Sequence, residues 1–559
     1  MRRCCQIIAS ITAPLLLAAG ALAATSASPG GSTLWIAKPP IAGPLSPPPE
    51  LPPAPPDTPE ALRLGYRLAH YYCLACHLFP EPLLLDRDTW RDGALRKMAP
   101  LLGVGRVNLD RRPDGEILKS AGIFPDAPLL PESEWRAICD YYESSAPAAA
   151  LPPPSREPIA PTSRLFQPRV IPCPNPHPGV TLVRMDSAGR GLWVGTAQPP
   201  SLDLLDRRGR VLHREPMESP PTSIESRPEG HYVTLVGDVF PSDARHGRVV
   251  LVREGVSGRA WHVRPLLEGL QRPVEASLVD MDGDGHEDLV VASFGNYLGR
   301  LSWYGRSAGG GYVEHILLSR PGALCVFAPP VRRGARQSLL VLMAQAREGV
   351  YRLDPTGGED FEETPLLQFP PVYGCTHAEW IDFNGDGALD LLLTNGDNGE
   401  YASPFKNYHG IRLYLNDGRG GLSLAWFYPL NGAFKAVAAD FDGDGDLDIA
   451  AISFFPDFGR SPEEAFLYLE NLGGMKFKAS TIPLGTQGRW LTMEAGDLDG
   501  DGDLDIILGS FTQGPASVPI PQAIREGWLT NEAGLLFLEN VGVERGQRNP
   551  VQRGDKERR

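Results

Sequence analysis

Cys73, Cys76 and His77 form the chain's most reactive short motif, two cysteines separated by two residues and followed directly by a histidine. Two thiols at this spacing can add to the vinyl groups of a haem, and the adjacent imidazole then reaches the iron as an axial ligand. A redox-active cysteine pair or a chance spacing is the alternative, but a thioredoxin-like pair needs a strand–helix–strand context, which this segment lacks. The motif therefore predicts one covalent haem c.

The iron also needs a sixth ligand or an open site. Met98 is the only methionine between residues 60 and 145, and methionine opposite histidine raises the reduction potential, as electron transfer requires. We therefore predict Met98 as the sixth ligand. Two alternatives stay open: Met98 fills a gap in the core, or His70 takes its place, although its position just before the motif makes the distal side hard to reach.

A second set of reactive side chains recurs four times further along the chain. Each copy places oxygen ligands at relative positions 1, 3, 5 and 9, and its glycines allow a tight turn. Hard oxygen donors without histidine or cysteine suit Ca²⁺, and a four-fold recurrence makes an ordinary acidic turn a poor explanation. Position 12 lacks the glutamate of an EF-hand. The predicted calcium ligands are Asp280, Asp282, Asp284 and Asp288; Asp382, Asn384, Asp386 and Asp390; Asp440, Asp442, Asp444 and Asp448; and Asp497, Asp499, Asp501 and Asp505.

The haem motif needs a helical unit around it. Pro-rich linkers over residues 24–59 and 146–177 bracket residues 60–145, where Leu64, Leu68 and Tyr71 recur at the spacing of one helix face. Two more helices are predicted, one reaching residue 102 and one from 131 to 142. A unit this small could bury little core without the porphyrin.

The acidic loops lie between apolar runs typical of strands. Their first aspartates are separated by 102, 58 and 57 residues, and a copy without an acidic loop lies inside the longest interval. Two degenerate copies precede the first loop, which makes seven units. A period near 50 with several strands per unit indicates a seven-bladed β-propeller, predicted here over residues 178–542.

Both halves resemble known families. Residues 60–145 resemble a small monohaem cytochrome c domain, through the haem motif and a last helix ending in Tyr141 and Tyr142. The acidic loops between strands resemble the FG-GAP/VCBS repeats of integrin-α-type propellers. Together the resemblances imply a multidomain fold, a small all-α haem domain followed by an all-β seven-bladed propeller with about four structural calcium ions on one face.

Three long insertions, residues 398–409, 454–464 and 511–528, each follow the strand after an acidic loop, which places them on the face opposite the ions. They should bring together Lys406, Tyr408, His409, Phe455 and Trp528. Aromatic loops on a rigid scaffold commonly bind something, so this face is predicted to bind a ligand, a partner or the haem domain. A packed lid over the central channel is an equal alternative.

The N-terminus indicates export. Arg2 and Arg3 precede an apolar stretch that ends in Ala21-Leu22-Ala23, so residues 1–23 are predicted to be a cleaved signal peptide that leaves no transmembrane anchor. The mature protein would be periplasmic or extracellular. A formal net charge of -15 argues against nucleic-acid binding. Residues 543–559 form a charged tail without periodicity, which predicts disorder.

An exported protein can carry disulfides, but the sequence does not decide the pairing among Cys139, Cys173, Cys325 and Cys375. Three functions remain. The first is an electron-transfer protein whose haem domain is tethered to a propeller that binds a redox partner protein or small ligand. The second is an oxidoreductase with its substrate site on the propeller. The third is an adhesive or carbohydrate-binding propeller. No dinucleotide fingerprint and no Ser/His/Asp set can be placed, so the sequence does not say whether the protein is an enzyme.

Overall fold

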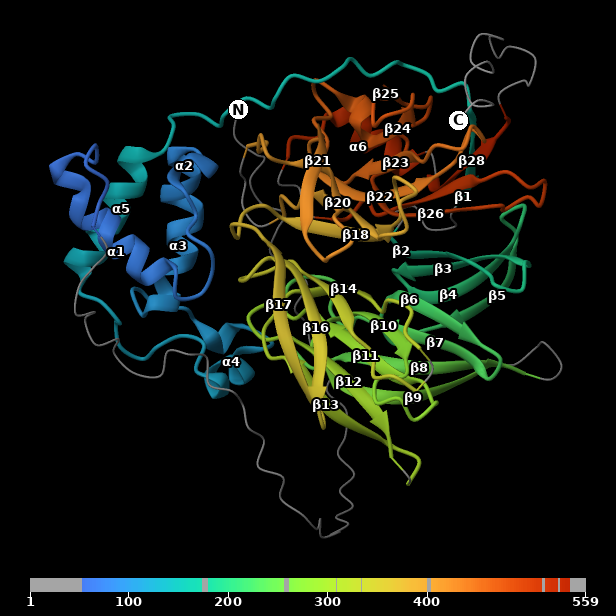
Figure 1. Cartoon of the computed structure of the whole chain (residues 1–559), viewed down its shortest axis with the longest axis horizontal. Coiled ribbons are helices and arrows are strands. Elements are labelled where there is room, and N and C mark those ends of the chain that lie inside the picture. The colour runs from blue at the N-terminus through green and yellow to red at the C-terminus, as the bar shows by residue number, and fades with distance from the viewer. Residues whose placement is uncertain are drawn as a thin grey trace, which may run out of the picture. The chain divides into compact units, whose positions relative to one another are not determined.

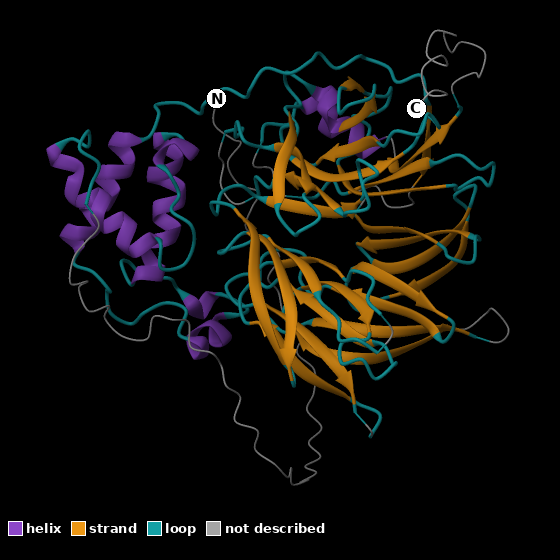
Figure 2. Ribbon diagram, viewed as in Figure 1, coloured by secondary structure: helices purple, strands orange, loops and turns teal. Residues whose placement is uncertain are grey.

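The computed structural model describes residues 53–172, 179–255, 261–307, 309–332, 334–399, 404–514, 518–530 and 533–542. The expected signal peptide, Cys173 and the expected tail lie outside these ranges. Residues 39–559 form one compact unit, which contains a group of helices followed by sheets (Figures 1 and 2).

The helices lie in residues 60–145, called here the helical module. Its α-helices are α1 (Arg63–Cys73), α2 (Arg87–Thr89), α3 (Leu95–Met98), α4 (Gly115–Ala121) and α5 (Glu132–Ser145). A π turn (Trp90–Ala94) joins α2 to α3, and a 3-10 turn (Ala99–Leu102) extends α3, so this stretch ends at residue 102 as expected. Sequence analysis did not anticipate α4.

Helices α1 and α5 pack closely because of one glycine. A Cβ atom on Gly65 would lie 2.1 Å from the carbonyl oxygen of Ala137, so any larger residue would push the two helices apart. Leu68, Trp90 and Ile138 are buried around this contact and form the module's apolar core.

The described strands form seven four-stranded antiparallel sheets, which are the blades of a propeller. Blades 1 to 4 consist of β2 (Val180–Met185), β3 (Gly191–Ala197), β4 (Pro200–Asp206) and β5 (Val211–Pro216); β6 (Pro221–Arg227), β7 (Gly230–Leu235), β8 (Gly247–Glu254) and β9 (Trp261–Leu270); β10 (Pro273–Val279), β11 (Asp288–Ser293), β12 (Arg300–Arg306) and β13 (Tyr312–Leu318); and β14 (Ala323–Phe327), β15 (Leu339–Met343), β16 (Gly349–Gly357) and β17 (Asp360–Gln368).

Blades 5 to 7 consist of β18 (Cys375–Ile381), β19 (Asp390–Asn395), β20 (Gly410–Asn416) and β21 (Leu422–Pro429); β22 (Ala433–Ala439), β23 (Asp448–Ser453), β24 (Phe466–Asn471) and β25 (Phe477–Ser480); and β26 (Trp490–Gly496), β27 (Asp505–Ser510), β28 (Ala533–Asn540) and β1 (Phe166–Pro172). Helix α6 (Gln522–Thr530) lies between β27 and β28. The expected all-β seven-bladed propeller is confirmed.

Strand β1 closes the ring. It pairs antiparallel with β28, Phe166 opposite Asn540, so the last blade takes its outer strand from before the first blade. The expected start of the propeller at residue 178 is therefore wrong, since β1 lies inside the expected linker 146–177. Pro168 and Pro172 made this strand hard to predict, because prolines argue against a central strand and only an edge strand tolerates them.

The linker before β1 also contacts the propeller. Residues 156–163, called here the strap, lie against blade 6: Arg156 forms an ion pair of 2.7 Å with the buried Glu464 and donates to the carbonyl of Pro429, and Ala160 forms a β-bridge with Ser480. The expectation of an extended, unattached spacer over 146–177 is therefore wrong for the strap as well.

All seven inner strands share one irregularity. In each blade the register between the first and second strands shifts after the first residue of the inner strand. Inner strands are then joined by glutamates: Glu225, Glu275 and Glu379 each accept a backbone N–H from the inner strand of the next blade. The second strands β11, β19, β23 and β27 are buried along their whole length, which explains their apolar sequences.

Candidate functional site

The C-x-x-C-H motif begins at the last residue of α1. Cys73 is half-buried, and the Tyr142 hydroxyl lies 4.0 Å from its sulfur. Burial raises the pKa of the Cys73 thiol to about 12, whereas Cys76 is exposed. Neither cysteine forms a disulfide, and within the described ranges Cys139, Cys325 and Cys375 are free thiols too.

The ring of His77 is fixed by its neighbour. Its Nδ1 lies 2.8 Å from the carbonyl oxygen of Leu78, and because a carbonyl only accepts, Nδ1 must carry the proton and donate it. The other nitrogen, Nε2, is then the unprotonated one, and burial lowers the pKa of His77 and favours this neutral form. A histidine that binds a metal through one ring nitrogen commonly donates the other to a carbonyl in this way.

The two candidates for the sixth ligand differ in their surroundings. Met98 is half-buried at the end of α3 and does not belong to the apolar core of the module, so the structure gives no support to a core-filling role. His70 is stacked between Phe79 and Tyr66, with ring centroids 3.6 and 3.9 Å away, and its Nδ1 lies 3.0 Å from the carbonyl oxygen of Tyr66. The His70 ring is therefore held by these stacking and hydrogen-bond contacts, and Met98 stays the predicted sixth ligand.

The residues around the motif fit a porphyrin. Leu74 and Leu78, which flank the second cysteine and the histidine, are 47% and 37% exposed and so present apolar surface beside the motif. A planar apolar group attached at Cys73 and Cys76 would cover such side chains. The thiol, imidazole and thioether donors match the ligand chemistry of haem iron.

Three of the four acidic loops bring carboxylate oxygens within 4.8 Å of one another. These groups are Asp280, Asp282 and Asp288; Asp440, Asp442 and Asp444; and Asp497, Asp499 and Asp505. In the remaining loop, Asp382–Asp390, the amide of Asn384 donates to Asp386 at 2.9 Å, so two expected ligands are bonded to each other. The chemistry of three loops suits a hard cation.

The aspartate at position 9 has a role that the sequence did not reveal. In blade 7, Asp505 is 1% exposed and accepts the backbone N–H of Leu498 at 3.0 Å and that of Asn540 at 2.9 Å. The equivalent residues Asp288, Asp390 and Asp448 likewise accept hydrogen bonds on both oxygens. Position 9 thus ties its loop to the end of the third strand, whether or not a cation is bound.

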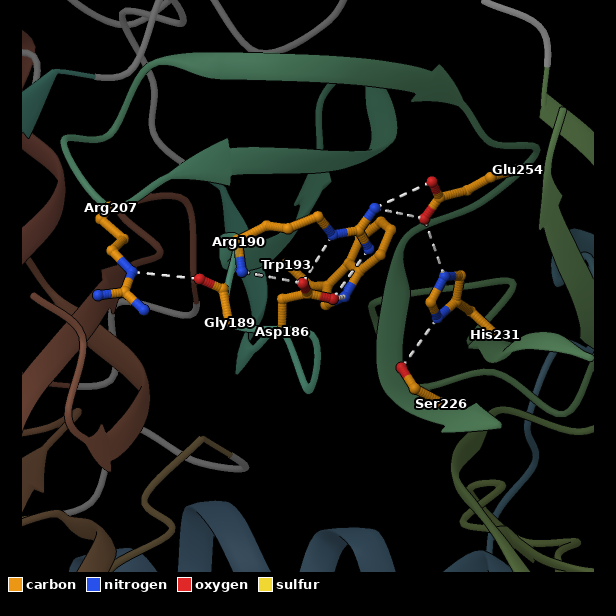
Figure 3. A network of polar contacts seen from close by, with 8 residues as sticks. All are labelled: Asp186, Gly189, Arg190, Trp193, Arg207, Ser226, His231 and Glu254. Atoms are coloured by element: carbon orange, nitrogen blue, oxygen red, sulfur yellow. Dashed lines mark hydrogen bonds and ion pairs between the residues drawn. The ribbon is translucent and has the colours of Figure 1, made fainter. Parts of the chain in front are cut away.

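Blade 1 has an arginine where other blades have an acidic loop (Figure 3). Asp186 follows β2 as Asp280 follows β10, and it accepts from the Nε of Arg190 at 2.7 Å. The same guanidinium donates to Glu254 of blade 2 at 2.7 Å, and the Trp193 indole also donates to Asp186. Arg190 therefore supplies beside Asp186 the positive charge that a cation would supply elsewhere.

Figure 3 also shows a serine, a histidine and a glutamate in a row. Ser226 Oγ lies 2.8 Å from His231 Nδ1, and His231 Nε2 lies 3.4 Å from Glu254. These are the residue types of a hydrolytic triad, but Glu254 is already bound by Arg190. The network is therefore better explained as a clip between blades 1 and 2.

The insertion face is not an open surface. Lys406, Tyr408, His409, Phe455 and Trp528 are all less than 9% exposed. Phe455 belongs to an apolar cluster with Phe454, Phe511 and Val518, which fits the lid alternative. Tyr408 instead packs into the core of the helical module, and its hydroxyl donates to the carbonyl of Leu84 at 3.1 Å. Of the occupants proposed for this face, the structure places the helical module there.

A second contact joins the helical module to the propeller. The buried carboxylate of Asp114 accepts the backbone N–H of Asp243 at 2.9 Å and is paired with Arg112 at 2.8 Å. Asp243, itself fully buried, accepts three backbone N–H groups from residues 296–298, and the Arg112 guanidinium lies over the ring of Tyr297. No local sequence pattern signalled this clasp, because its partners are more than 100 residues apart.

Comparison with known proteins supports the propeller. Residues 400–451, which include the third acidic loop, match the FG-GAP-like repeat. No curated protein has a sequence that matches the chain. None of the described helices combines the length and apolar composition that a bilayer crossing demands.

Similar solved structures include three propeller-sized chains of low identity. The WD40 domain of Neurospora crassa Pan2 is 12% identical and aligns over 68% of this chain and 97% of its own, with a TM-score of 0.41. A Lactobacillus plantarum protein is 12% identical over 54% and 85%, with a TM-score of 0.38. A putative 6-phosphogluconolactonase from Bacteroides fragilis is 11% identical over 54% and 84%, with a TM-score of 0.36. The repeat match supports the FG-GAP character of the propeller.

Proposed function

We propose that this chain is an exported c-type haem protein that transfers electrons, with the haem in the helical module and calcium ions in the propeller loops. The observation that carries the proposal is the ring of His77. The Leu78 carbonyl holds the proton on Nδ1, so Nε2 is available as an iron ligand directly after two free thiols.

Each residue of the motif has a defined part in this proposal. The sulfurs of Cys73 and Cys76 would hold the haem through thioether bonds, and His77 Nε2 and the Met98 sulfur would bind its iron. The haem supplies one-electron chemistry when bound. The apolar side chains of Leu74 and Leu78 exclude water from its edge. Haem attachment of this kind fits the proposed export to the periplasm or beyond.

The proposed role of calcium is structural. Three loops gather three carboxylates each, and such groups repel one another unless a cation lies between them. We include the Asp382 loop as a weaker fourth site, because Asn384 contributes no charge. The ions would fasten the loops on the face opposite the insertions, away from the haem motif.

The test uses the full chain produced in a periplasm equipped for haem attachment. Acid–acetone extraction should leave the Soret absorption with the protein, and Cys76→Ala should weaken it. Cys139→Ala, which removes a free thiol outside the motif, is the matched control. Colour that extracts from the wild-type protein into acetone would refute covalent attachment.

One alternative is an oxidoreductase whose substrate site lies on the propeller. It is favoured by the ionisable residues that lie buried where the propeller meets the helical module, among them Lys406 and His409. Reduction of the haem by a candidate substrate, without an added redox protein, would favour the oxidoreductase. A purely adhesive propeller would leave the cysteine motif without a role.

A further inference from the structure

The loop between β15 and β16, residues 344–348, carries a basic and an acidic side chain of opposite exposure. Ala346 adopts a left-handed backbone conformation with φ of 52°, which turns the chain so that Arg347 is exposed and Glu348 is buried. Burial raises the pKa of the Cys76 thiol, and the positive charge of Arg347 opposes this rise, so this loop acts electrostatically on the motif.

Glu348 is a buried carboxyl group with an unused oxygen. It is 1% exposed, and its Oε1 accepts the backbone N–H of Cys375 at 2.5 Å. Its Oε2 has no hydrogen-bond partner within the described part of the chain. A buried polar atom without a partner is costly and commonly marks a functional group, an ion or a water.

The groups facing Glu348 come from three elements. Cys375 of β18 contributes its thiol, Lys406 of the blade 5 insertion contributes an ammonium, and Arg412 of β20 contributes a guanidinium. Arg412 donates to Asn395 and to the Tyr408 carbonyl, both at 2.6 Å, and Asn395 donates to the Cys375 sulfur.

This cluster lies beneath the contact between the two parts of the protein. Tyr408 and Tyr373 stack at 4.6 Å and pack into the helical module, and Arg412 lies over the Tyr373 ring. Burial raises the pKa of Glu348 to about 7, while its backbone hydrogen bonds and Lys406 oppose the rise. Glu348 is thus an ionisable group in a low-dielectric region beneath the contact with the helical module, where an added charge acts strongly.

We propose that Glu348 takes up a proton when the haem of the helical module is reduced. This inference rests on the proposed function. An external one-electron donor supplies the electron to the iron, solvent supplies the proton, and the Glu348 carboxylate becomes a neutral carboxyl group at Oε2. No bond of the haem breaks. The propeller would then be more than a support, since it makes electron uptake depend on pH.

The experiment is a spectroelectrochemical titration of the full-length protein between pH 5 and 9, with dithionite and ferricyanide as the end-point reagents. In the wild type the midpoint potential should fall as pH rises through a range that begins near pH 7. In Glu348→Gln the midpoint potential should change little over this pH range. Glu379→Gln is the matched control, because burial also raises the pKa of Glu379 to about 7 but its charged neighbours, Lys435 and Glu494, lie on the inner strands β22 and β26 of the propeller. The control should keep the wild-type dependence.

Every outcome decides something. Any of three results would overturn the proposal: a wild-type midpoint potential that is independent of pH, a Glu348→Gln protein whose potential still depends on pH, or a Glu379→Gln protein whose potential no longer does. If Glu348→Gln does not fold, Glu348→Asp keeps a carboxyl group in an altered position, and its pH range should be displaced; an unchanged range overturns the proposal. A protein without covalent haem would instead refute the proposed function.

Discussion

Asp505 should stabilise blade 7 even when calcium is absent. Replacement by alanine removes the acceptor of two N–H groups, those of Leu498 and Asn540, at residues that are 2% and 3% exposed. A buried donor left without a partner costs about 1–3 kcal/mol, so Asp505→Ala should lower the free energy of unfolding by about 2–6 kcal/mol. Most of this loss should persist in a chelator.

Asp499→Ala is the informative comparison. Asp499 belongs to the same carboxylate group, but it is exposed and its Oδ1 accepts only from the N–H of Asp501 within the loop. Its replacement should destabilise the propeller in calcium and have little effect in a chelator. Urea unfolding followed by tryptophan fluorescence measures the free energy of unfolding of both variants, with and without calcium. Equal losses for both variants in calcium, both abolished by the chelator, would refute the hydrogen-bonding role of position 9.

Four further outcomes follow from the same contacts. Chelation should lower the melting temperature of the propeller and leave the haem spectrum unchanged; a lost haem band would contradict a purely structural role for calcium. Met98→Ala should abolish the weak sulfur-to-iron absorption band and lower the midpoint potential, whereas an unchanged spectrum would transfer the role to another ligand. Asp114→Ala leaves the buried N–H of Asp243 without its acceptor, at a cost of about 1–3 kcal/mol, and should increase proteolysis between the helical module and the propeller; a cleavage rate equal to wild type would contradict the clasp. Burial raises the pKa of Glu379 from its ordinary value of 4.5 to about 7 in the folded protein. Its contribution to the free energy of unfolding is therefore present at low pH and is lost as pH rises from 4.5 to 7. Glu379→Gln should remove that part of the pH dependence, which urea titrations at several pH values would measure.

The sequence predicted the features that depend on local pattern. Seven units were countable because each buried second strand, such as residues 289–293, is a short apolar run, and the acidic loops marked four of them. The C-x-x-C-H motif was equally local. The half-buried position of Met98 agrees with its predicted availability but does not test its ligation.

The features that escaped depend on distant contacts. Strand β1 contains two prolines, and it can be recognised as a strand only from its pairing with β28. Asp114 and Asp243 each look like ordinary surface aspartates, and only the fold buries them together. Lys406 and His409 were expected on a binding face because they are polar residues in a long insertion, whereas they are 8% and 2% exposed. The hydrogen bond between Asn384 and Asp386 became visible only from side-chain geometry.

The pairing of β1 with β28 has a consequence for how the chain folds during synthesis. The two strands are about 370 residues apart, so β1 leaves the ribosome or export channel long before its partner exists. At 5–20 residues per second the delay is roughly 20–70 seconds. The helical module, complete before β1, has this interval for its own folding and for the proposed attachment of haem at Cys73 and Cys76. The ring can close only after the last blade arrives, so a chain stopped before β28 would present an unpaired edge to quality-control proteases.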